Sequence, residues 1–394
     1  PHGLAYYIRL MFVPYPQTIN YEWFPVEQHI SQVVVLSAAA ILFLIFTAVY
    51  YYKKAPEVTV GVYWFLAALA PVNNVVTPIY TYINERYLYL SSFGMIIAVV
   101  FFIRYYVSKI SRSEIQKNIV ACILFLIPFL GACYMTFVRL PVWKDHKVFW
   151  AAALDVDYDN IRNKTNYAIA LQKEGNYIES LIVLKSALHI KSLPESAYIE
   201  VYRSIITAAL RFHDVETARI YLIESLTQFP DNAGLELLEI KYYFAQKNYK
   251  KAEERGRDFT DNFSLEKASK DTSLYEIPFY YLVAKKMNGD TAGVNKLLDQ
   301  VANESIRQEI NEITDARALM LQGKENEALD KFYISLKKNE SPWLDAYLWL
   351  GELYEGKQDW ENALAVYQTA LYKNPANIDS VLRYEHVLKK LAEE

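Results

Sequence analysis

Residues 344–377, LDAYLWLGELYEGKQDWENALAVYQTALYKNPAN, decide the fold of the C-terminal part of this chain. The small residues Gly351 and Ala363 stand where the two helices of a hairpin must approach each other closely, and Tyr367 fills the gap beside them. Pro375 ends the second helix, because proline has no amide hydrogen and cannot continue a helix. The stretch therefore predicts two antiparallel helices joined by a short turn.

This spacing is that of the tetratricopeptide repeat (TPR), which is about 34 residues long. It is met by Tyr347, Leu350, Gly351, Tyr354, Ala363, Tyr367, Ala370 and Pro375. Weaker copies, each interpreted as a turn followed by a second helix, occur at residues 173–188, 212–230, 245–259, 287–301 and 321–336. Their close-approach positions are Ser180, Ala218, Ala252, Val294 and Ala328. Residues 141–394 are therefore predicted to form an α-helical TPR solenoid of about six repeats, with residues 378–391 as a capping helix.

A TPR solenoid is curved, and proteins of this kind use the concave face as an extended binding surface. We therefore expect the concave face of the repeats to bind an acceptor or partner protein. The aromatic residues inside the repeats are interpreted as core packing.

Charge is distributed unevenly along the 394 residues. Residues 1–140 contain nine Lys or Arg, five Glu and no Asp, whereas residues 141–394 contain 32 Lys or Arg and 40 Asp or Glu. The first part is poor in charge and the second is rich in it. This difference predicts two domains in different surroundings, a membrane domain over residues 1–140 and a water-exposed domain over residues 141–394.

The first domain contains apolar segments of the length that crosses a bilayer, roughly 20 residues. The four segments are residues 31–52, 58–83, 88–107 and 118–138. Pro71 and Pro78 interrupt the second segment, so its helix is expected to end near Val72. The predicted fold class is all-α, with a multi-span transmembrane helical domain followed by a TPR α-solenoid.

Positive residues predict the orientation of this domain. The two loops richest in them carry Lys53, Lys54, Arg104, Lys109, Arg112 and Lys117. Because cytoplasmic loops have an excess of Lys and Arg, we expect both loops in the cytoplasm. Residues 1–30, the loop with Glu85 and Arg86, and the TPR domain are then on the non-cytoplasmic side, in the bacterial periplasm or the lumen of the endoplasmic reticulum.

The sequence lacks the patterns of several kinds of site. It has no P-loop, no dinucleotide-binding fingerprint and no basic stripe for nucleic acid. The six histidines show no ligand spacing, so neither a metal site nor a cofactor is expected. Cys122 and Cys133 lie in one predicted helix, too far apart to form a disulfide with each other.

The stretch NNVVTPIYTYINERYLYLSSFG, residues 73–94, places an adjacent acid and base, Glu85 and Arg86, in an uncharged neighbourhood. Ionisable groups at the edge of a membrane are costly to desolvate and are functional by default. The alternative interpretation is that Asn84, Glu85 and Arg86 form a polar cap on a helix that begins near Tyr87.

The longer stretch APVNNVVTPIYTYINERYLYLSSFG resembles a segment of the transmembrane and TPR-repeat O-mannosyltransferases, the TMTC type of the GT-C glycosyltransferase superfamily, and of their bacterial relatives. That segment runs Pro-x-x-Asn and later Glu-Arg-x-Leu-Tyr-Leu-Pro-Ser-x-Gly. The matching residues are Pro71, Asn74, Glu85, Arg86, Leu88, Tyr89, Leu90, Ser92 and Gly94, while Ser91 replaces the proline. Two further stretches are similar to the same family: YYIRLMFVPYPQTINYEW (6–23), with Asn20 in place of Asp, and VWKDHKVFWAAAL (142–154).

The resemblance implies a membrane glycosyltransferase, or its C-terminal portion, that transfers a sugar from a polyprenyl-phosphate-linked donor to a protein on the non-cytoplasmic side. The repeats would hold the acceptor. Arginine suits the donor phosphate because its planar guanidinium can donate two parallel hydrogen bonds. We expect Arg86 to bind the phosphate and Glu85 to orient Arg86, while Arg9 and Tyr89 assist.

The catalytic acid of that superfamily lies in its first outer loop, but this chain has neither such a loop nor any Asp before Asp145. Glu22 and Glu27 do not match the family motif. No catalytic residue is therefore assigned in this chain, and we expect the catalytic half to lie upstream of Pro1. Two alternatives stay open: an O-antigen-ligase-like oligosaccharyltransferase, and a non-enzymatic, membrane-anchored TPR scaffold for envelope protein assembly.

Overall fold

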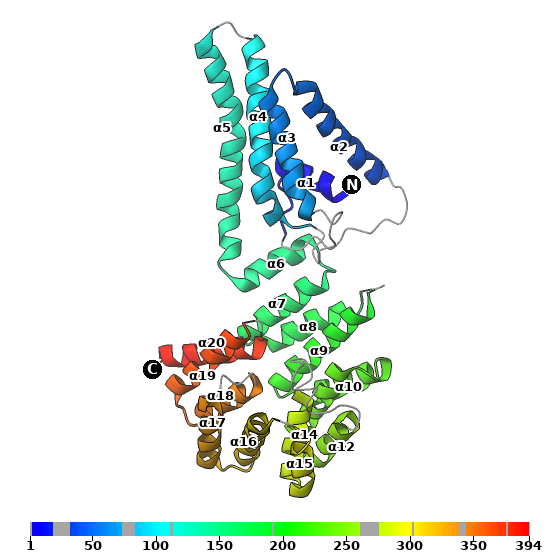
Figure 1. The fold of residues 1–394 in the computed structure, drawn as a ribbon, viewed down its shortest axis with the longest axis vertical. Helices are drawn as coiled ribbons and strands as arrows, with labels where there is room; N and C mark the ends of the chain where they lie inside the picture. The colour runs from blue at the N-terminus through cyan, green and yellow to red at the C-terminus, as the bar shows by residue number, and fades with distance from the viewer. Residues whose placement is uncertain are drawn as a thin grey trace. The chain divides into compact units, whose positions relative to one another are not determined.

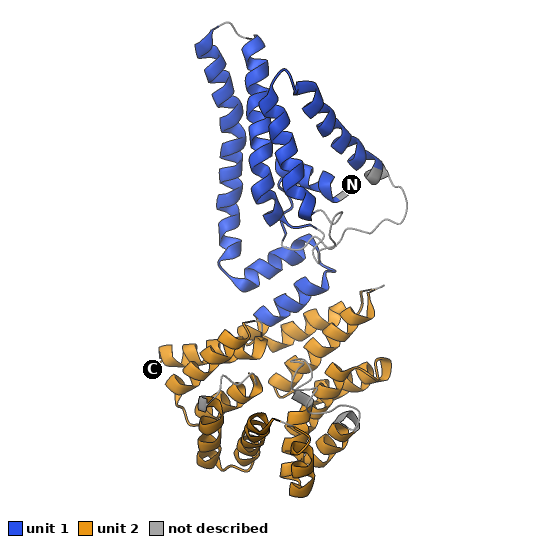
Figure 2. Ribbon diagram, viewed as in Figure 1, with its two compact units in different colours: residues 1–170 blue, residues 171–394 orange. Residues whose placement is uncertain are grey.

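The structure of this chain is a computed structural model that describes residues 2–18, 32–72, 83–110, 113–190, 193–260, 276–301, 303–338, 344–375 and 377–393. All regular secondary structure in these ranges is helical. The chain divides into two compact units, residues 1–170 and residues 171–394 (Figure 2). Residues 141–170, which the sequence analysis grouped with the repeats, belong to the first unit.

The first unit is built from helices of very different length (Figure 1). They are α1 (His2–Phe12), α2 (Gln32–Tyr51), α3 (Pro56–Leu69), α4 (Leu88–Ile110), α5 (Glu114–Arg139) and α6 (His146–Val156), with the short 3₁₀ helices η1 (Ala70–Val72), η2 (Glu85–Tyr87) and η3 (Leu140–Trp143). Helix α7 (Ile161–Lys173) begins in the first unit and ends in the second.

Helices α3 and α4 pack closely because glycines face each other where they meet. A Cβ atom on Gly61 would lie 2.5 Å from the carbonyl oxygen of Gly94, and a Cβ atom on Gly94 would lie 2.6 Å from the carbonyl oxygen of Gly61. Small residues let two backbones approach in this way at helix interfaces in membranes. Gly94, which the sequence analysis noted only as part of a resemblance, therefore has a packing role.

Helix α1 packs against α3 and the start of α4 through an apolar cluster. Its Tyr7 is completely buried in this cluster together with Phe65 and Leu69 of α3. The Tyr7 hydroxyl also accepts a hydrogen bond from the backbone N–H of Asn84 at 3.1 Å. This contact ties α1 to the residue that precedes η2.

Two helical stretches among the described residues are long and apolar enough to cross a membrane, Glu85–Lys109 and Glu114–Trp143. Two further apolar stretches within the residues whose side chains are described, Val35–Tyr51 and Pro56–Val72, have 10–17 residues, and α2 as a whole has 20. Two of the four predicted spans thus coincide with helices that are long and apolar enough, and the predicted four-span domain is not supported.

Helix α3 is short because a proline follows it. Its 14 residues extend about 21 Å at about 1.5 Å per residue, less than the hydrocarbon core of about 30 Å. It ends at Leu69, and the chain continues as η1, which contains Pro71 and reaches Val72. This confirms the predicted helix end near Val72, whereas the interruptions predicted at Asn74 and Pro78 lie outside the described residues.

The second unit is an array of helix pairs, which makes it a TPR-type α-solenoid (Figure 1). Its helices are α8 (Tyr177–Ala187), α9 (Glu195–Arg211), α10 (Val215–Gln228), α11 (Ala233–Ala245), α12 (Tyr249–Thr260), α14 (Glu276–Met287), α15 (Thr291–Leu298), α16 (Glu304–Leu321), α17 (Glu325–Lys338), α18 (Leu344–Gly356), α19 (Trp360–Lys373) and α20 (Ile378–Glu393). Every segment predicted as a second helix contains one, namely α8, α10, α12, α15 and α17. Helix α20 occupies the residues predicted to form the capping helix.

The close-approach positions predicted from the sequence are buried. Ser180, Ala218, Ala252, Ala328 and Ala363 have no exposed surface, and Val294 is 3% exposed. In the last pair, a Cβ atom on Gly351 would overlap the ring of Tyr367. The predicted close contact of α18 and α19 is thus confirmed.

The turns within the helix pairs share one backbone conformation. A residue with φ between 56° and 80° stands before the second helix at Gly175, His213, Lys247, Gly289, Gly323 and Gln358. This left-handed region is easiest for glycine to adopt. In several pairs the next residue is an Asn or Asp whose side chain accepts a hydrogen bond from a backbone N–H of the first turn, as at Asn176, Asp214, Asp290 and Asp359.

Candidate functional site

The four sequence-predicted site residues lie on α1, η2 and the first turn of α4. Arg9 is in the last turn of α1, and Glu85 and Arg86 belong to η2. The hydrogen bond described above holds α1 beside the start of η2. Tyr6 and Tyr7 of α1 also pack in one apolar cluster with Ile83 and Tyr87, which lie on either side of Glu85 and Arg86 in the chain. The structure therefore gathers these residues from distant parts of the sequence.

Arg9 and Arg86 are exposed, and each contacts a neighbour in its own segment. The Arg9 guanidinium donates to the carbonyl oxygen of Tyr15 at 2.8 Å. The Arg86 guanidinium donates to the Tyr87 hydroxyl at 3.4 Å. The side chain of Asn84 accepts a hydrogen bond from the backbone N–H of Arg86 at 3.1 Å. The polar cap considered as an alternative interpretation is therefore present.

Tyr89 lies in the first turn of α4, three residues after Arg86, and its side chain is 88% exposed. The binding of a donor phosphate by Arg86, Glu85, Arg9 and Tyr89 stays a prediction. Four residues weighed in the sequence analysis lie outside the described residues: Asn20, Glu22, Glu27 and Asn74.

A row of ion pairs crosses the inner face of the repeat array. We define this face by the first helices of the pairs and by α20, because α9, α11, α14, α16, α18 and α20 contact one another in that order. Cations from the start of the array meet carboxylates from its end: Lys173 Nζ to Glu385 Oε1 at 2.8 Å, Arg211 Nη2 to Asp379 Oδ1 at 2.5 Å, and Lys241 Nζ to Asp345 Oδ2 at 3.9 Å.

The two sides of this row carry opposite charge. We call the three cations, which lie on α7, α9 and α11, the basic wall, and the three carboxylates, which lie on α18 and α20, the acidic wall. Because of these pairs, α20 returns to the start of the array, beside α9 (Figure 1). The face predicted to bind an acceptor or partner is therefore spanned by contacts of the chain with itself.

Arg211 is held in place by more than its ion pair. Its guanidinium also donates to the side-chain oxygen of Gln172 at 2.5 Å, and the Gln172 amide donates to the Ser180 hydroxyl at 2.8 Å. Gln172 is 6% exposed, so this support lies in the interior. Burial disfavours the charged form of Asp379, but the positive charges of Arg211 and Lys241 outweigh it and hold the pKa of Asp379 below its usual value.

A second charged cluster lies beside the acidic wall on the same two helices. Arg383 of α20 lies 3.0 Å from Glu352 and 3.2 Å from Glu355 of α18. Arg317 of α16 adds a contact of 2.9 Å to Glu352. These pairs join α16, α18 and α20 and orient the acidic wall.

The sequence analysis missed both walls. Arg211 and Asp379 are 168 residues apart, and no local pattern relates them. One signal was available, because Asp345 and Asp379 are each the second residue of a helix and are one repeat apart. Aligning the last repeat with the capping helix places these two carboxylates on the same face.

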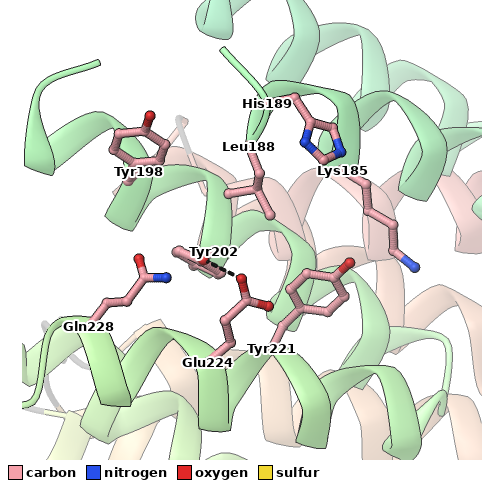
Figure 3. Close-up of a pocket in the computed structure, with 8 residues that line it drawn as sticks. All are labelled: Lys185, Leu188, His189, Tyr198, Tyr202, Tyr221, Glu224 and Gln228. Atoms are coloured by element: carbon pink, nitrogen blue, oxygen red, sulfur yellow. Dashed lines mark hydrogen bonds between the residues drawn. The ribbon is translucent and has the colours of Figure 1, made fainter. Parts of the chain in front are cut away.

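A pocket of about 410 Å³ lies between α8, α9 and α10 (Figure 3). It is lined by Lys185, Leu188, His189, Tyr198, Tyr202, Tyr221, Glu224 and Gln228. The Tyr202 hydroxyl donates to Glu224 at 2.7 Å, and the Tyr198 hydroxyl donates to the carbonyl oxygen of Ile190 at 2.8 Å. The pocket has charges of both signs, and two of its three tyrosine hydroxyls already bond within the chain.

Among the residues that the structure describes, no three His, Cys, Asp or Glu side chains gather in a way that could hold a metal ion. Cys122 and Cys133 are exposed thiols on α5. The inner face presents charged side chains, which can bind groups of opposite charge.

No protein-family model matches this chain, and no curated protein matches it significantly. The solved structures that align with it include a tetratricopeptide repeat protein from Parabacteroides merdae, 17% identical with a TM-score of 0.37, where the alignment covers 61% of this chain and 91% of the other. A thermophilic TPR protein of Thermus thermophilus is 18% identical with a TM-score of 0.26, covering 58% and 100%. The TPR domain of P58(IPK) is 13% identical with a TM-score of 0.23, covering 77% and 95%. At these scores the alignments carry no functional conclusion.

Proposed function

We propose that this chain is a membrane-anchored TPR scaffold that binds partner proteins. The observation that carries the proposal is the exposed apolar helix α5 in a chain that also contains a repeat array. The stretch Glu114–Trp143 has 30 residues, and none of its most apolar window is buried in the structure. Its charged residues stand near its ends, at Glu114, Lys117 and Arg139.

Water is an unfavourable surrounding for α5. Phe137 is 74% exposed, Ile127 66% and Leu130 55%, and the helix has no buried residue. Fully removing one large apolar side chain from water gains about 1.5–3 kcal/mol, so the sum over the helix strongly favours a hydrocarbon environment. A lipid bilayer supplies that environment along the whole helix.

The repeat array supports the binding part of the proposal. TPR solenoids present extended curved surfaces to other proteins. We place the array on the non-cytoplasmic side, in the bacterial periplasm or the lumen of the endoplasmic reticulum. This placement is supported by Lys53, Lys54 and Lys109, which lie at the turns before α3 and before α5 and favour a cytoplasmic location for those turns.

The two cysteines of the chain test the membrane placement, because both lie on α5 and both are exposed in the structure. In cells that express the full chain, we expect a membrane-impermeant maleimide to leave Cys122 and Cys133 unmodified, because lipid covers them. Both should react once the membrane is dissolved and the chain is denatured. Mass spectrometry of the modified thiols measures the outcome.

A Tyr372→Cys variant is the matched control, since Tyr372 is 89% exposed on the repeat array. Its added thiol should react in intact cells of a bacterial host from the periplasmic side. Rapid reaction of Cys122 and Cys133 in membranes without detergent would place α5 in water and end the anchoring proposal. Reaction of the added thiol only from the cytoplasmic side would reverse the proposed orientation.

Transfer of a sugar from a polyprenyl-phosphate donor is a second candidate function, as the C-terminal portion of a glycosyltransferase. It is favoured by one observation, the hydrogen bond from Asn84 to Tyr7 that holds α1, which carries Arg9, beside η2, which carries Glu85 and Arg86. Two exposed guanidinium groups near the ends of apolar helices suit a phosphate at a membrane surface.

Replacing Arg86 with alanine tests this candidate. A hydrogen bond to a charged group contributes about 1.5–3 kcal/mol, so the affinity of the purified chain for polyprenyl monophosphate should fall about tenfold or more. Arg104→Ala removes an exposed arginine elsewhere on α4 and should leave the affinity unchanged. Equal binding by the wild type and the Arg86→Ala variant, measured by tryptophan fluorescence titration in detergent, would remove Arg86 from any donor site.

A further inference from the structure

Carboxylates of the chain itself occupy the basic wall, and they indicate the kind of group that this wall can bind. Lys173, Arg211 and Lys241 each meet a carboxylate, and the carboxylates come from helices at the far end of the sequence. Gln172 orients the guanidinium of Arg211 from the interior, and Lys241 lies over the ring of Tyr280 at 5.3 Å, so both have support besides their carboxylates. A surface with fixed cations of this kind is built for acidic groups.

The contacts that occupy this surface are easily exchanged. The side chains of Glu385 and Asp379 are 48% and 46% exposed, so water reaches one side of each, although neighbouring helices surround Asp379 closely enough to oppose its charge. Their cationic partners are more covered, at 18% for Lys173 and 20% for Arg211. Ion pairs with an exposed member are weak, and salt screens them. The carboxylates can therefore leave while Gln172 keeps Arg211 in position.

Helix α20 has a separate anchor that does not depend on the basic wall. Val387 of α20 is completely buried against Ala363 and Tyr367 of α19. Arg383 adds ion pairs to α18. Losing the pairs to Arg211 and Lys173 would therefore free the inner face without removing α20 from the last repeat.

We propose that the basic wall is a binding site for an acidic peptide segment of a partner protein, and that the acidic wall of the same chain occupies this site until the partner displaces it. The proposal rests on the proposed scaffold function and adds the chemistry of the partner and a competition within the chain. In the resting state the acidic wall covers the basic wall, and the acidic peptide segment of the partner displaces it.

The test uses the full chain in detergent and a fluorescent peptide of consecutive glutamates as the probe. Asp379→Asn combined with Glu385→Gln removes two of the three carboxylates of the acidic wall, keeps Asp345, and leaves the basic wall intact. Two weak ion pairs are lost, so the affinity for the peptide should rise about fivefold. Adding Arg211→Ala to this variant should reverse the gain, and raising the salt concentration should weaken binding in every variant.

Arg203→Ala is the matched control, because Arg203 is on α9 like Arg211 but its side chain is 50% exposed and pairs locally with Glu200. This variant should bind the peptide as the wild type does. A lysine peptide of the same length should not gain affinity when the acidic wall is neutralised. Unchanged affinity for the glutamate peptide after Asp379→Asn with Glu385→Gln, or tighter binding of the lysine peptide by the wild type, overturns the proposal.

Exchanging the charges of Arg211 and Asp379 distinguishes competition at the basic wall from a general loss of structure. Arg211→Asp alone should increase amide hydrogen exchange in α20, and adding Asp379→Arg should restore protection by rebuilding the pair in reverse. Failure of the restored pair to protect α20 counts against closure by this contact. The thiol labelling described above does not depend on these residues, so it judges the membrane scaffold independently.

Discussion

Replacing Tyr367 with alanine is expected to lower the free energy of unfolding of the last repeat by about 3–5 kcal/mol, the range found when a large buried aromatic side chain is removed. Tyr367 is completely buried, and its ring fills the space left by Gly351 on the facing helix. Alanine would leave a cavity there, because the backbones of α18 and α19 cannot close over the missing ring.

The hydroxyl of Tyr367 adds to the expected loss. It donates a hydrogen bond to the Glu355 carboxylate, which also pairs with Arg383 of α20. Burial raises the pKa of Tyr367 above its usual value, so the hydroxyl stays protonated and remains a donor. Removing the hydroxyl takes one hydrogen-bond donor away from the Glu355 carboxylate, which lies at the contact between α18, α19 and α20.

Hydrogen exchange of α18 and α19 amides in the full chain, measured across a urea series, determines the change. Tyr372→Ala is the matched control, since Tyr372 lies on the same helix and is 89% exposed. It should change the free energy by less than about 0.5 kcal/mol. Equal effects of the two substitutions would contradict the packing described for Gly351 and Tyr367.

Replacing Gly94 with valine is the second change with a large expected effect. The new side chain would meet the carbonyl oxygen of Gly61 and the backbone nitrogen of Phe65, at 2.6 Å and 2.8 Å from its Cβ. These are backbone atoms that cannot rotate away, so α3 and α4 must separate. Overpacking of this kind costs about 1–3 kcal/mol and occasionally more, and we expect a value at or above the upper end.

Gly131→Val provides the control for this experiment, because Gly131 lies on another apolar helix with nothing within 4 Å of its new Cβ atom. The thermal unfolding midpoint of the detergent-solubilised chain should fall for Gly94→Val and stay within error for Gly131→Val. A similar midpoint for both variants would show that α3 and α4 do not approach as closely as the structure places them.

The helix pairs could be predicted from the sequence because their signals are local. Gly351 and Tyr367 are 16 residues apart and meet within one hairpin, and the burial of Ala218 and Ala252 follows from the same repeat. The prediction of the membrane spans was less accurate. The charge-free run over residues 58–83 was counted among the four spans even though its helix was expected to end near Val72, and α3 with η1 is indeed no longer than that.

The ion pairs of the inner face could not be predicted in the same way. Whether Arg211 meets Asp379 depends on the summed rotation of all the repeats between them, and small changes at each repeat would move the two residues apart. The predicted site at Arg86 is a different case. The placement of η2 beside α1 depends on the contact of Tyr7 with Asn84, which the sequence analysis did not relate to each other.

The return of α20 to α9 changes how this array forms during synthesis. In an open solenoid each repeat contacts only its neighbours, so the chain can complete its structure progressively from the N-terminus. Here the carboxylates for Arg211 and Lys173 come from α20, which is synthesised after all the repeats that separate it from α9. The nascent chain therefore carries these positive charges without their carboxylate partners until α20 has been made.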